Sequence, residues 1–341
     1  MASHGGKNAI TDPKILDFSS STSPILPKFV NDSMKDLSLI SEYPYPQHTL
    51  LRKQLSKQFK ISPSNVIIGN GAVEIIYDFC KAFLNNSIDV LIPTPTFSEY
   101  ESATKLANCK IHFFKTMDLS KNLKSFLKKI PHNGCVFICN PNNPTGKLLG
   151  KEQMRLILET ARKNSSFVFV DECFMDLATS NQSVIPLLDK YTNLLILKSF
   201  TKSFALAGIR IGFALSSKIV TSTLYKVKIP WSVNGLAQKI AIEALKNKSY
   251  IINARKLIQK ERIYLTCSIS GISGFKCIET SANFILINSR KSSKLVCKKL
   301  LSHHILVRDC STFRGLDDHF IRVSVKTHKN NVKLVEALEV I

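Results

Sequence analysis

The sequence has few acidic residues and lacks the features that mark several special protein classes. Its 25 Asp and Glu residues stand against 47 Lys and Arg, which gives a formal net charge of +22, and tryptophan occurs once. There is no low-complexity tract and no repeat of solenoid or propeller length, which excludes fibrous and repeat architectures. No apolar run is longer than a strand, so we expect no membrane-spanning helix.

Paired cysteines are also absent. The nine cysteines contain no CxxC pair, and several lie within apolar runs such as CVFIC (135–139). This pattern favours reduced, buried thiols over disulfides or a zinc site. The N-terminal stretch MASHGGKNAITDPK has no apolar segment of the secretory type. We therefore expect a cytoplasmic protein.

The excess of basic residues is not accompanied by a nucleic-acid-binding motif. The lysines are scattered along the chain, with no basic arm, zinc finger, RNP-like strand or helix-turn-helix pattern. We expect a solvated lysine-rich surface, no nucleic-acid partner and no membrane partner. An anionic small-molecule substrate is compatible with this charge.

The order of apolar runs indicates an α/β protein. Between the runs lie helix-length stretches such as 72–84 and 151–163, and because the runs are apolar on both faces we expect a mostly parallel sheet covered by helices on both sides. The runs are 65–69, 90–95, 111–114, 135–141, 167–174, 194–200 and 211–215.

The pattern changes after about residue 240, where a long helical stretch leads to strand-like runs at 283–289, 305–309 and 319–325. This change predicts a second, smaller α+β domain. We expect residues 40–240 to form the large domain, and residues 1–39 together with 241–341 to form the small one.

Polar residues gather where the buried strands end, which is where open α/β sheets bind ligands. GNGAVE (69–74) follows a strand and opens a helix, so its backbone N–H groups can seat an anion. CNPNNPTGK (139–147) ends another strand, Asp171 a third, and Lys202 follows a fourth. Taken singly, each feature also has an ordinary structural explanation. In the same order, these are a βα turn, a tight loop, a helix cap and a surface lysine.

Taken together, the four features meet the requirements of one cofactor. A desolvated lysine is a nucleophilic amine, and a buried carboxylate needs a cationic partner. An amine for a Schiff base, an acid for a pyridinium nitrogen, an amide for a phenolic oxygen and a phosphate seat are the groups that pyridoxal 5′-phosphate needs.

The motif order GNGxxE, PTPTFSEY, NPNNPTG, VDE and SFTK-x7-R-x-G resembles the fold-type-I pyridoxal-phosphate enzymes over nearly the whole chain. The resemblance implies that Lys202 binds the cofactor covalently, Asp171 pairs with its pyridinium nitrogen, Asn143 bonds its ring oxygen and Phe97 stacks on its ring. It implies a homodimer with shared sites, in which Tyr43 reaches the phosphate of the other subunit. The remaining phosphate contacts implied are Gly71, Ala72, Val73, Ser199, Thr201 and Arg210.

Four further stretches resemble the threonine-phosphate decarboxylases of cobalamin biosynthesis, which form (R)-1-amino-2-propanol O-2-phosphate and carbon dioxide. They are HGG (4–6), LDFS (16–19), PWSVN (230–234) and the stretch 305–325. Phe174 also fits, because aminotransferases usually carry a tyrosine there. The resemblance implies that Arg322, Arg308 and His4 bind the substrate, and that Lys202 returns a proton to Cα.

Other interpretations remain open at this point. The main alternative is an aminotransferase acting on histidinol phosphate or a similar phosphorylated amine, and a non-enzymatic binding protein is a third. Arg322 can hold either the carboxylate or the phosphate, and serine phosphate competes with threonine phosphate as substrate. The serines and threonine of SSSTSP (19–24) stand where the decarboxylases carry an asparagine, so a substrate contact is altered there. We expect Trp231 to pack, and Asn234 either to face the cofactor or to cap a helix.

Overall fold

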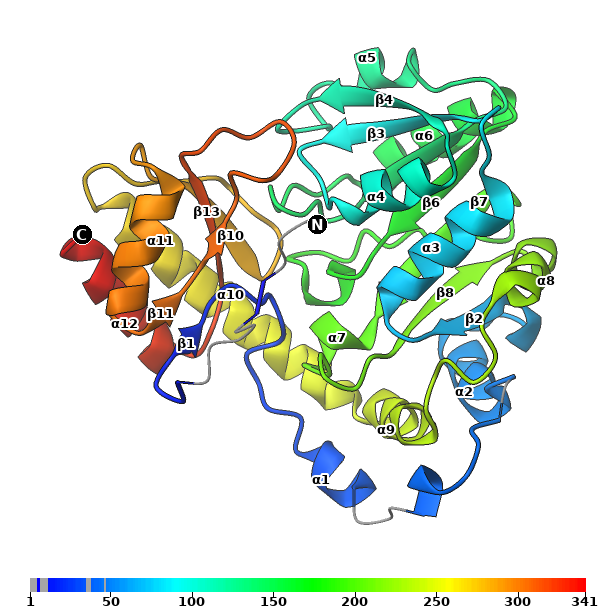
Figure 1. Cartoon of the computed structure of the whole chain (residues 1–341), viewed down its shortest axis with the longest axis horizontal. Helices are drawn as coiled ribbons and strands as arrows, with labels where there is room; N and C mark the ends of the chain where they lie inside the picture. The colour runs from blue at the N-terminus through cyan, green and yellow to red at the C-terminus, as the bar shows by residue number, and fades with distance from the viewer. Residues whose placement is uncertain (1–4, 7–11, 35–37, 46) are drawn as a thin grey trace.

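The structure is a computed structural model that describes residues 5–6, 12–34, 38–45 and 47–341. Two parts lie side by side: a large sheet between helices, and a smaller sheet covered by α10 (Lys248–Ser270), α11 (Ser293–Ser302) and α12 (His328–Glu339) (Figure 1). Among the described residues, no helix is both long and apolar enough to cross a membrane. All nine cysteines are free thiols.

The large sheet has seven strands in the order β2-β8-β7-β6-β5-β3-β4. Only β8 runs antiparallel to its neighbours. The mostly parallel sheet predicted from the apolar runs is thus confirmed. The strands are β2 Val66–Gly69, β3 Asp89–Thr94, β4 Lys110–Lys115, β5 Cys135–Cys139, β6 Phe167–Asp171, β7 Leu194–Ser199 and β8 Gly212–Ser216.

Helices cover both faces of this sheet because its central strands are apolar on both sides. Along β5, Val136 and Ile138 belong to one core cluster, whereas Phe137 and Cys139 belong to another. The helices of this part are α2 Thr49–Phe59, α3 Ala72–Phe83, α4 Glu99–Leu106, α5 Leu123–Leu127, α6 Lys151–Lys163, α7 Phe200–Ser203, α8 Lys218–Val227 and α9 Gly235–Lys246.

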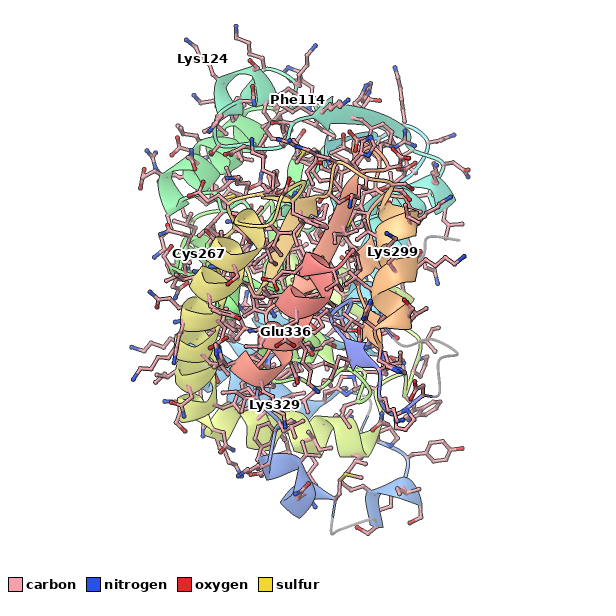
Figure 2. All side chains as sticks on the ribbon, turned by 90° about the vertical axis from the view of Figure 1, so that its left-hand side faces the viewer. Phe114, Lys124, Cys267, Lys299, Lys329 and Glu336 are labelled. Atoms are coloured by element: carbon pink, nitrogen blue, oxygen red, sulfur yellow. The ribbon has the colours of Figure 1, made fainter. Side chains whose placement is uncertain are left out.

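The smaller part contains an antiparallel sheet in the order β12-β13-β10-β9 and a parallel pair of β1 with β11. Figure 2 views this part from the side that α10, α11 and α12 cover, with Cys267, Lys299 and Glu336 labelled on these three helices. The elements are β1 Leu16–Asp17, β9 Lys276–Cys277, β10 Phe284–Asn288, β11 Ile305–Leu306, β12 Arg308–Asp309, β13 Phe320–Ser324, α10 Lys248–Ser270, α11 Ser293–Ser302 and α12 His328–Glu339.

The N-terminal forty residues contact both parts. Phe18 belongs to the core of the small sheet, whereas Phe29 and Val30 of α1 (Phe29–Ser33) pack against the core of the large one. Residue 240 lies inside α9. The division of the chain at residues 40 and 240 stays a prediction. The described residues also contain short 3-10 helices at Ser38–Ile40, Pro63–Asn65, Met175–Leu177 (η3) and Ile185–Leu187.

Candidate active site

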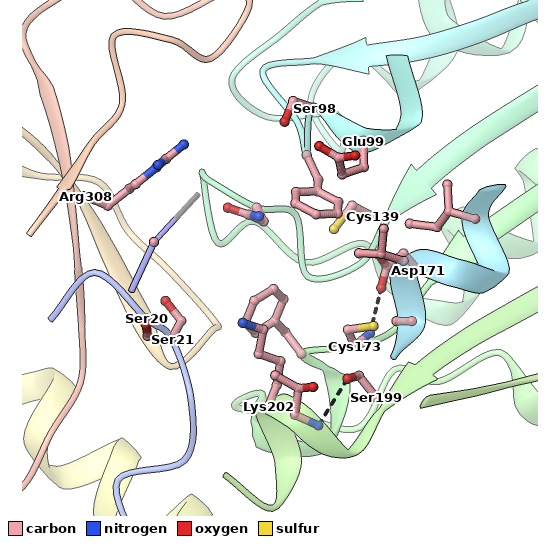
Figure 3. Close-up of a pocket in the computed structure, with 18 of the residues that line it drawn as sticks. Ser20, Ser21, Ser98, Glu99, Cys139, Asp171, Cys173, Ser199, Lys202 and Arg308 are labelled. Atoms are coloured by element: carbon pink, nitrogen blue, oxygen red, sulfur yellow. Dashed lines mark hydrogen bonds between the residues drawn. The ribbon is translucent and has the colours of Figure 1, made fainter. Parts of the chain in front are cut away.

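A cavity of about 420 Å³ lies at the carboxyl ends of β5, β6 and β7, between the two parts of the molecule. The edge of the sheet and the start of α3 form one wall, and β12 and β13 contribute to the other. Figure 3 shows Lys202, Asp171 and Arg308 facing this space from three different sides. The cavity therefore brings together residues that are far apart in the sequence.

Lys202 stands on α7, a single helical turn directly after β7. Ser199 caps this turn, since its Oγ accepts a hydrogen bond from the Thr201 N–H at 3.1 Å. The Lys202 ammonium lies 5.6 Å from the centre of the Phe174 ring. Burial, followed by the positive charges of Arg322 and Arg210, lowers the pKa of Lys202 to about 8. A lysine with such a pKa is partly neutral near pH 8 and can act as a nucleophile.

Asp171 ends β6 as a buried carboxylate held by two hydrogen bonds. The Tyr100 hydroxyl donates to its Oδ2 at 2.6 Å, and the Cys173 N–H donates to its Oδ1 at 2.9 Å. Both donors are neutral, and within the described part of the chain no side chain forms an ion pair with it. A buried carboxylate that faces a cavity in this way suits a cationic ligand group, such as a protonated pyridine nitrogen.

The start of α3 forms an anion seat. Gly71 precedes the helix with φ at 80° and ψ at 163°, and as the N-cap residue it has no side chain that could cap the first N–H groups. A β-carbon on Gly71 would collide with the Arg210 guanidinium, so the missing side chain leaves room for the arginine. Ala72, Val73, Ser199 and Thr201 line the cavity at this end. Helix N–H groups, hydroxyls and an arginine together suit a phosphate group.

Asn143 and Phe97 complete the predicted cofactor contacts. Asn143 is buried, and its Oδ1 accepts a hydrogen bond from Arg322 Nη1. Phe97 lies edge-on to Tyr100, with ring centres 5.7 Å apart. Both residues line the same cavity as Lys202. The buried carboxylate of Asp171, the amide of Asn143, the nucleophilic amine of Lys202 and the phosphate seat all fit pyridoxal phosphate.

Two arginines form the wall that the small sheet contributes. Arg308 on β12 and Arg322 on β13 are directly opposite in the antiparallel register, and each is only 7% exposed. Arg322 Nη2 donates to the Ser19 carbonyl at 3.2 Å, while its Nε has no hydrogen-bond partner among the described residues. Burial lowers the pKa of Arg322 to about 10 and also lowers that of Arg308. Two buried cations side by side create a site for anions.

Two predicted site residues are not placed at the cavity. Tyr43 is 86% exposed and lies against Trp231, with ring centres 5.5 Å apart. Its role in a partner's site therefore stays a prediction. His4 lies outside the described residues, but the adjoining Gly5 lines the cavity and the Gly6 N–H donates to Ser19 Oγ at 2.7 Å.

The PWSVN stretch lies elsewhere. Asn234 caps α9, with its Oδ1 accepting from the Ala237 N–H at 2.7 Å, and Trp231 is half-exposed beside Tyr43. Two roles were expected for Asn234, facing the cofactor or capping a helix, and the structure shows the helix cap.

Two residues at this site were not predicted from the sequence: Glu99, which lines the cavity, and Tyr100, which lies behind Asp171. Tyr100 binds Asp171, and Glu99 accepts a hydrogen bond from the Tyr77 hydroxyl at 2.7 Å. Both follow Phe97 in the PTPTFSEY motif, within one helical turn of it. Their position shortly after Phe97, a predicted cofactor contact, is the feature of the sequence that could have pointed to them.

The comparisons with known proteins agree with this geometry. Residues 16–338 match the family described as "Aminotransferase class I and II". A histidinol-phosphate aminotransferase of Caldanaerobacter subterraneus subsp. tengcongensis is 33% identical, over 91% of this chain and 87% of its own. A protein of the same bacterium, named "Putative threonine-phosphate decarboxylase", is 32% identical over 92% and 86%. The crystal structure of the histidinol-phosphate aminotransferase from Clostridium acetobutylicum superposes with a TM-score of 0.85 at 29% identity, covering 95% of this chain and 98% of that one.

Proposed function

The chain belongs to the class I and II aminotransferase family and is a pyridoxal-phosphate-dependent enzyme, and from this premise we propose that it decarboxylates L-threonine O-3-phosphate. The products would be (R)-1-amino-2-propanol O-2-phosphate and carbon dioxide. The amino alcohol phosphate would serve as the linker of the cobalamin nucleotide loop. Two relatives of nearly equal identity carry different activities in their names, so the choice between reactions depends on the site.

The opposed arginines carry this proposal. Arg308 and Arg322 present two buried positive charges to one cavity that also contains Lys202. Threonine phosphate has a phosphate and a carboxylate, so it offers one anion to each arginine. Charge-assisted bonds from planar guanidinium groups also fix orientation, because they are directional and often bidentate.

Orientation at Cα decides which bond breaks. Pyridoxal phosphate, when bound, supplies an electron sink for the electron pair of a bond that stands perpendicular to its ring. With both anionic groups held by arginines, the bond from Cα to the carboxylate carbon can be placed in that direction. An aminotransferase instead places the Cα–H bond there. The two arginines would thus select decarboxylation by fixing the rotation of the substrate.

The residues around Cα have complementary tasks. Asp171 would hold the proton on the pyridine nitrogen, supported by the Tyr100 hydroxyl. Lys202 would donate a proton to Cα after carbon dioxide leaves, since its amine faces the cavity and has a pKa of about 8. Arg210 and the start of α3 would keep the phosphate end of the cofactor fixed.

Phe174 supports the decarboxylase over the transferase. Its buried ring packs edge-on against Phe284, with ring centres 5.0 Å apart, and lies beside the Lys202 amine. Aminotransferases of this layout usually place a tyrosine hydroxyl at this position. With a phenyl ring here, Asn143 is left as the predicted neighbour of the ring oxygen.

A second candidate is a histidinol-phosphate aminotransferase. The carboxylate of Glu99 lines the cavity and is 8% exposed. An imidazole N–H could donate to this carboxylate, whereas a second anion near it would be repelled. Several relatives are named for this activity. The same two arginines would then bind the substrate phosphate and the carboxylates of a 2-oxo acid.

We also propose that two copies of the chain form a homodimer with shared sites, as the exposed position of Tyr43 allows. In that assembly Tyr43 would reach the cofactor phosphate of the partner. Tyr43 and Trp231 present aromatic surface that such a contact would cover.

Product analysis tests the reaction. Purified protein with cofactor is incubated with threonine phosphate, with and without 2-oxoglutarate, and the products are identified by mass spectrometry. Carbon dioxide and aminopropanol phosphate formed without the oxo acid support the proposal. Turnover confined to histidinol phosphate plus 2-oxoglutarate, with glutamate as product, overturns it in favour of the aminotransferase. Serine phosphate as a parallel substrate measures the contribution of the methyl group.

A further inference from the structure

A buried lysine, Lys198, lies four residues before Lys202 and faces a different environment. Lys198 is on β7 and is 2% exposed. Its Nζ lies 2.8 Å from Asp176 Oδ1 and 3.6 Å from Glu172 Oε2. Lys202, in contrast, lines the large cavity. The two amines therefore lie in separate environments, and Lys198 is held by carboxylates instead of facing the cavity.

Asp176 joins this lysine to the segment that carries Lys202. Its Oδ2 accepts a hydrogen bond from Ser203 Oγ at 2.8 Å, and Ser203 is the residue directly after Lys202. Its backbone carbonyl accepts a bond from Arg255 Nε of α10 at 2.6 Å, which fixes η3, the 3-10 turn around it. One carboxylate thus holds β7 on one side of Lys202 and the end of α7 on the other.

The other carboxylate ties the network to Asp171. Glu172, the next residue in the chain, is fully buried and accepts bonds from Ser183 Oγ at 2.6 Å and from the Val184 N–H at 2.7 Å. Neighbouring residues of an extended segment point to opposite sides, so Asp171 faces the cavity while Glu172 faces Lys198. The ends of β6 and β7 are therefore joined behind the cavity.

Burial raises the pKa of Glu172, whereas Asp176 and Lys198 stay charged over the neutral pH range. Burial would raise the pKa of Asp176, but Lys198 and two hydrogen bonds hold it below its ordinary value. Burial would likewise lower the pKa of Lys198, but the two carboxylates raise it. An ion pair of this kind, once buried and hydrogen-bonded, is costly to break.

We propose that Asp176 is a positioning residue for Lys202. α7 has only four residues, so few bonds within the helix determine where its lysine points. The Asp176 carboxylate supplies that constraint through Ser203 and Lys198, and thereby sets the approach of the Lys202 amine to the carbonyl carbon of the cofactor. This role depends on the cofactor of the family and not on which substrate the enzyme uses.

Two ligands separate positioning of the amine from general integrity of the site. Pyridoxal 5′-phosphate has an aldehyde that would condense with the Lys202 amine and release water, whereas pyridoxine 5′-phosphate has an alcohol and would bind without a covalent bond. Dissociation constants of both are measured on the cofactor-free full chain. For Asp176→Asn we expect affinity for the aldehyde to fall roughly tenfold, the loss of one hydrogen bond to a charged group, and affinity for the alcohol to change less than about twofold.

Ser203→Ala and Ser183→Ala complete the experiment. Ser203→Ala removes one hydrogen bond to Asp176. We expect this variant also to lose affinity for the aldehyde selectively, but by a smaller factor than Asp176→Asn. Ser183→Ala removes a bond to Glu172 away from α7 and is expected to leave both affinities unchanged. The proposal is overturned if the Asp176 and Ser203 variants weaken both ligands equally, which is the sign of a purely structural role, or weaken neither. Because no amino acid substrate is used, failure here is distinct from failure of the proposed decarboxylation.

Discussion

The hydroxyl of Tyr100 donates a hydrogen bond of 2.6 Å to Asp171 Oδ2. Tyr100 also stacks on Phe137, with ring centres 5.2 Å apart, and meets Phe97 edge-on. Complete burial and the neighbouring carboxylate raise the pKa of Tyr100 well above its ordinary value, so the hydroxyl stays a donor at all working pH values. One side chain thus supports both the carboxylate predicted to pair with the pyridine nitrogen and the aromatic ring predicted to stack on the cofactor.

Tyr100→Phe tests that support. Removing the hydroxyl takes away a hydrogen bond to a charged acceptor, which contributes about 1.5–3 kcal/mol. We expect roughly tenfold or greater loss of pyridoxal phosphate affinity, measured by equilibrium binding. Tyr191→Phe is the matched control, because Tyr191 is also buried and donates to a carboxylate, Glu159, at 3.2 Å outside the cavity. Equal cofactor affinity in the Tyr100 variant and the wild-type chain would contradict the assignment of Asp171.

Gly71→Ala tests the phosphate seat. The backbone of Gly71 lies in a region that is nearly closed to other residues and costs about 1–3 kcal/mol there, and the new methyl group would press on Arg210. We expect the variant to lose far more affinity for pyridoxal 5′-phosphate than for pyridoxal, which lacks the phosphate. Gly208→Ala is the control, because a β-carbon there meets nothing within 4 Å. A parallel loss for both ligands would argue against a phosphate site at this helix.

The pKa of Lys202 predicts the pH dependence of cofactor capture. The ammonium form is inert and the neutral amine reacts, so the rate of covalent capture should rise with pH and level off above about 8. Arg322 is one of the charges that lower this pKa, so Arg322→Gln should move the midpoint upward. Arg314→Gln, which removes a surface partner of Glu101, should leave it in place. Stopped-flow absorbance measures the rate, and a midpoint near the ordinary lysine value would contradict the account.

Arg308 and Arg322 can be assigned by comparing substrate with product. Aminopropanol phosphate keeps the phosphate but lacks the carboxylate. The arginine that holds the phosphate should, when changed to Gln, weaken binding of both compounds roughly 10- to 100-fold. The arginine that holds the carboxylate should, when changed to Gln, weaken binding of the substrate and leave binding of the product unchanged. Calorimetry on the two variants gives the answer, and unchanged substrate affinity in both would remove the basis for the proposed substrate.

The strands of the large sheet were predictable because the local pattern of apolar residues determines them. Strands buried on both faces are continuous apolar runs, and β5, with Val136 and Phe137 on opposite faces, is an example. Asp171 and Lys202 were predictable for a related reason: a charged residue directly after such a run lies at the ligand-binding edge of the sheet.

Other parts of the site depend on contacts that no local pattern contains. The bond from Ser203 to Asp176 joins residues 27 positions apart, and the pairing of Arg308 with Arg322 depends on strand register. Nothing in the sequence near Lys198 distinguishes this ion-paired lysine from Lys202, which lines the cavity. Tyr43 is a further example, because its predicted role in the partner's site depends on how two copies of the chain assemble.

The most direct test of the central claim asks which bond at Cα breaks. Threonine phosphate carrying deuterium at Cα is given to the cofactor-loaded enzyme in ordinary water, and the products are analysed by mass spectrometry. We expect aminopropanol phosphate that retains the deuterium, with carbon dioxide in equal amount, because the bond to the carboxylate breaks and Lys202 adds a proton. Loss of deuterium to solvent without release of carbon dioxide would show that the Cα–H bond is the one aligned, and would contradict the decarboxylase.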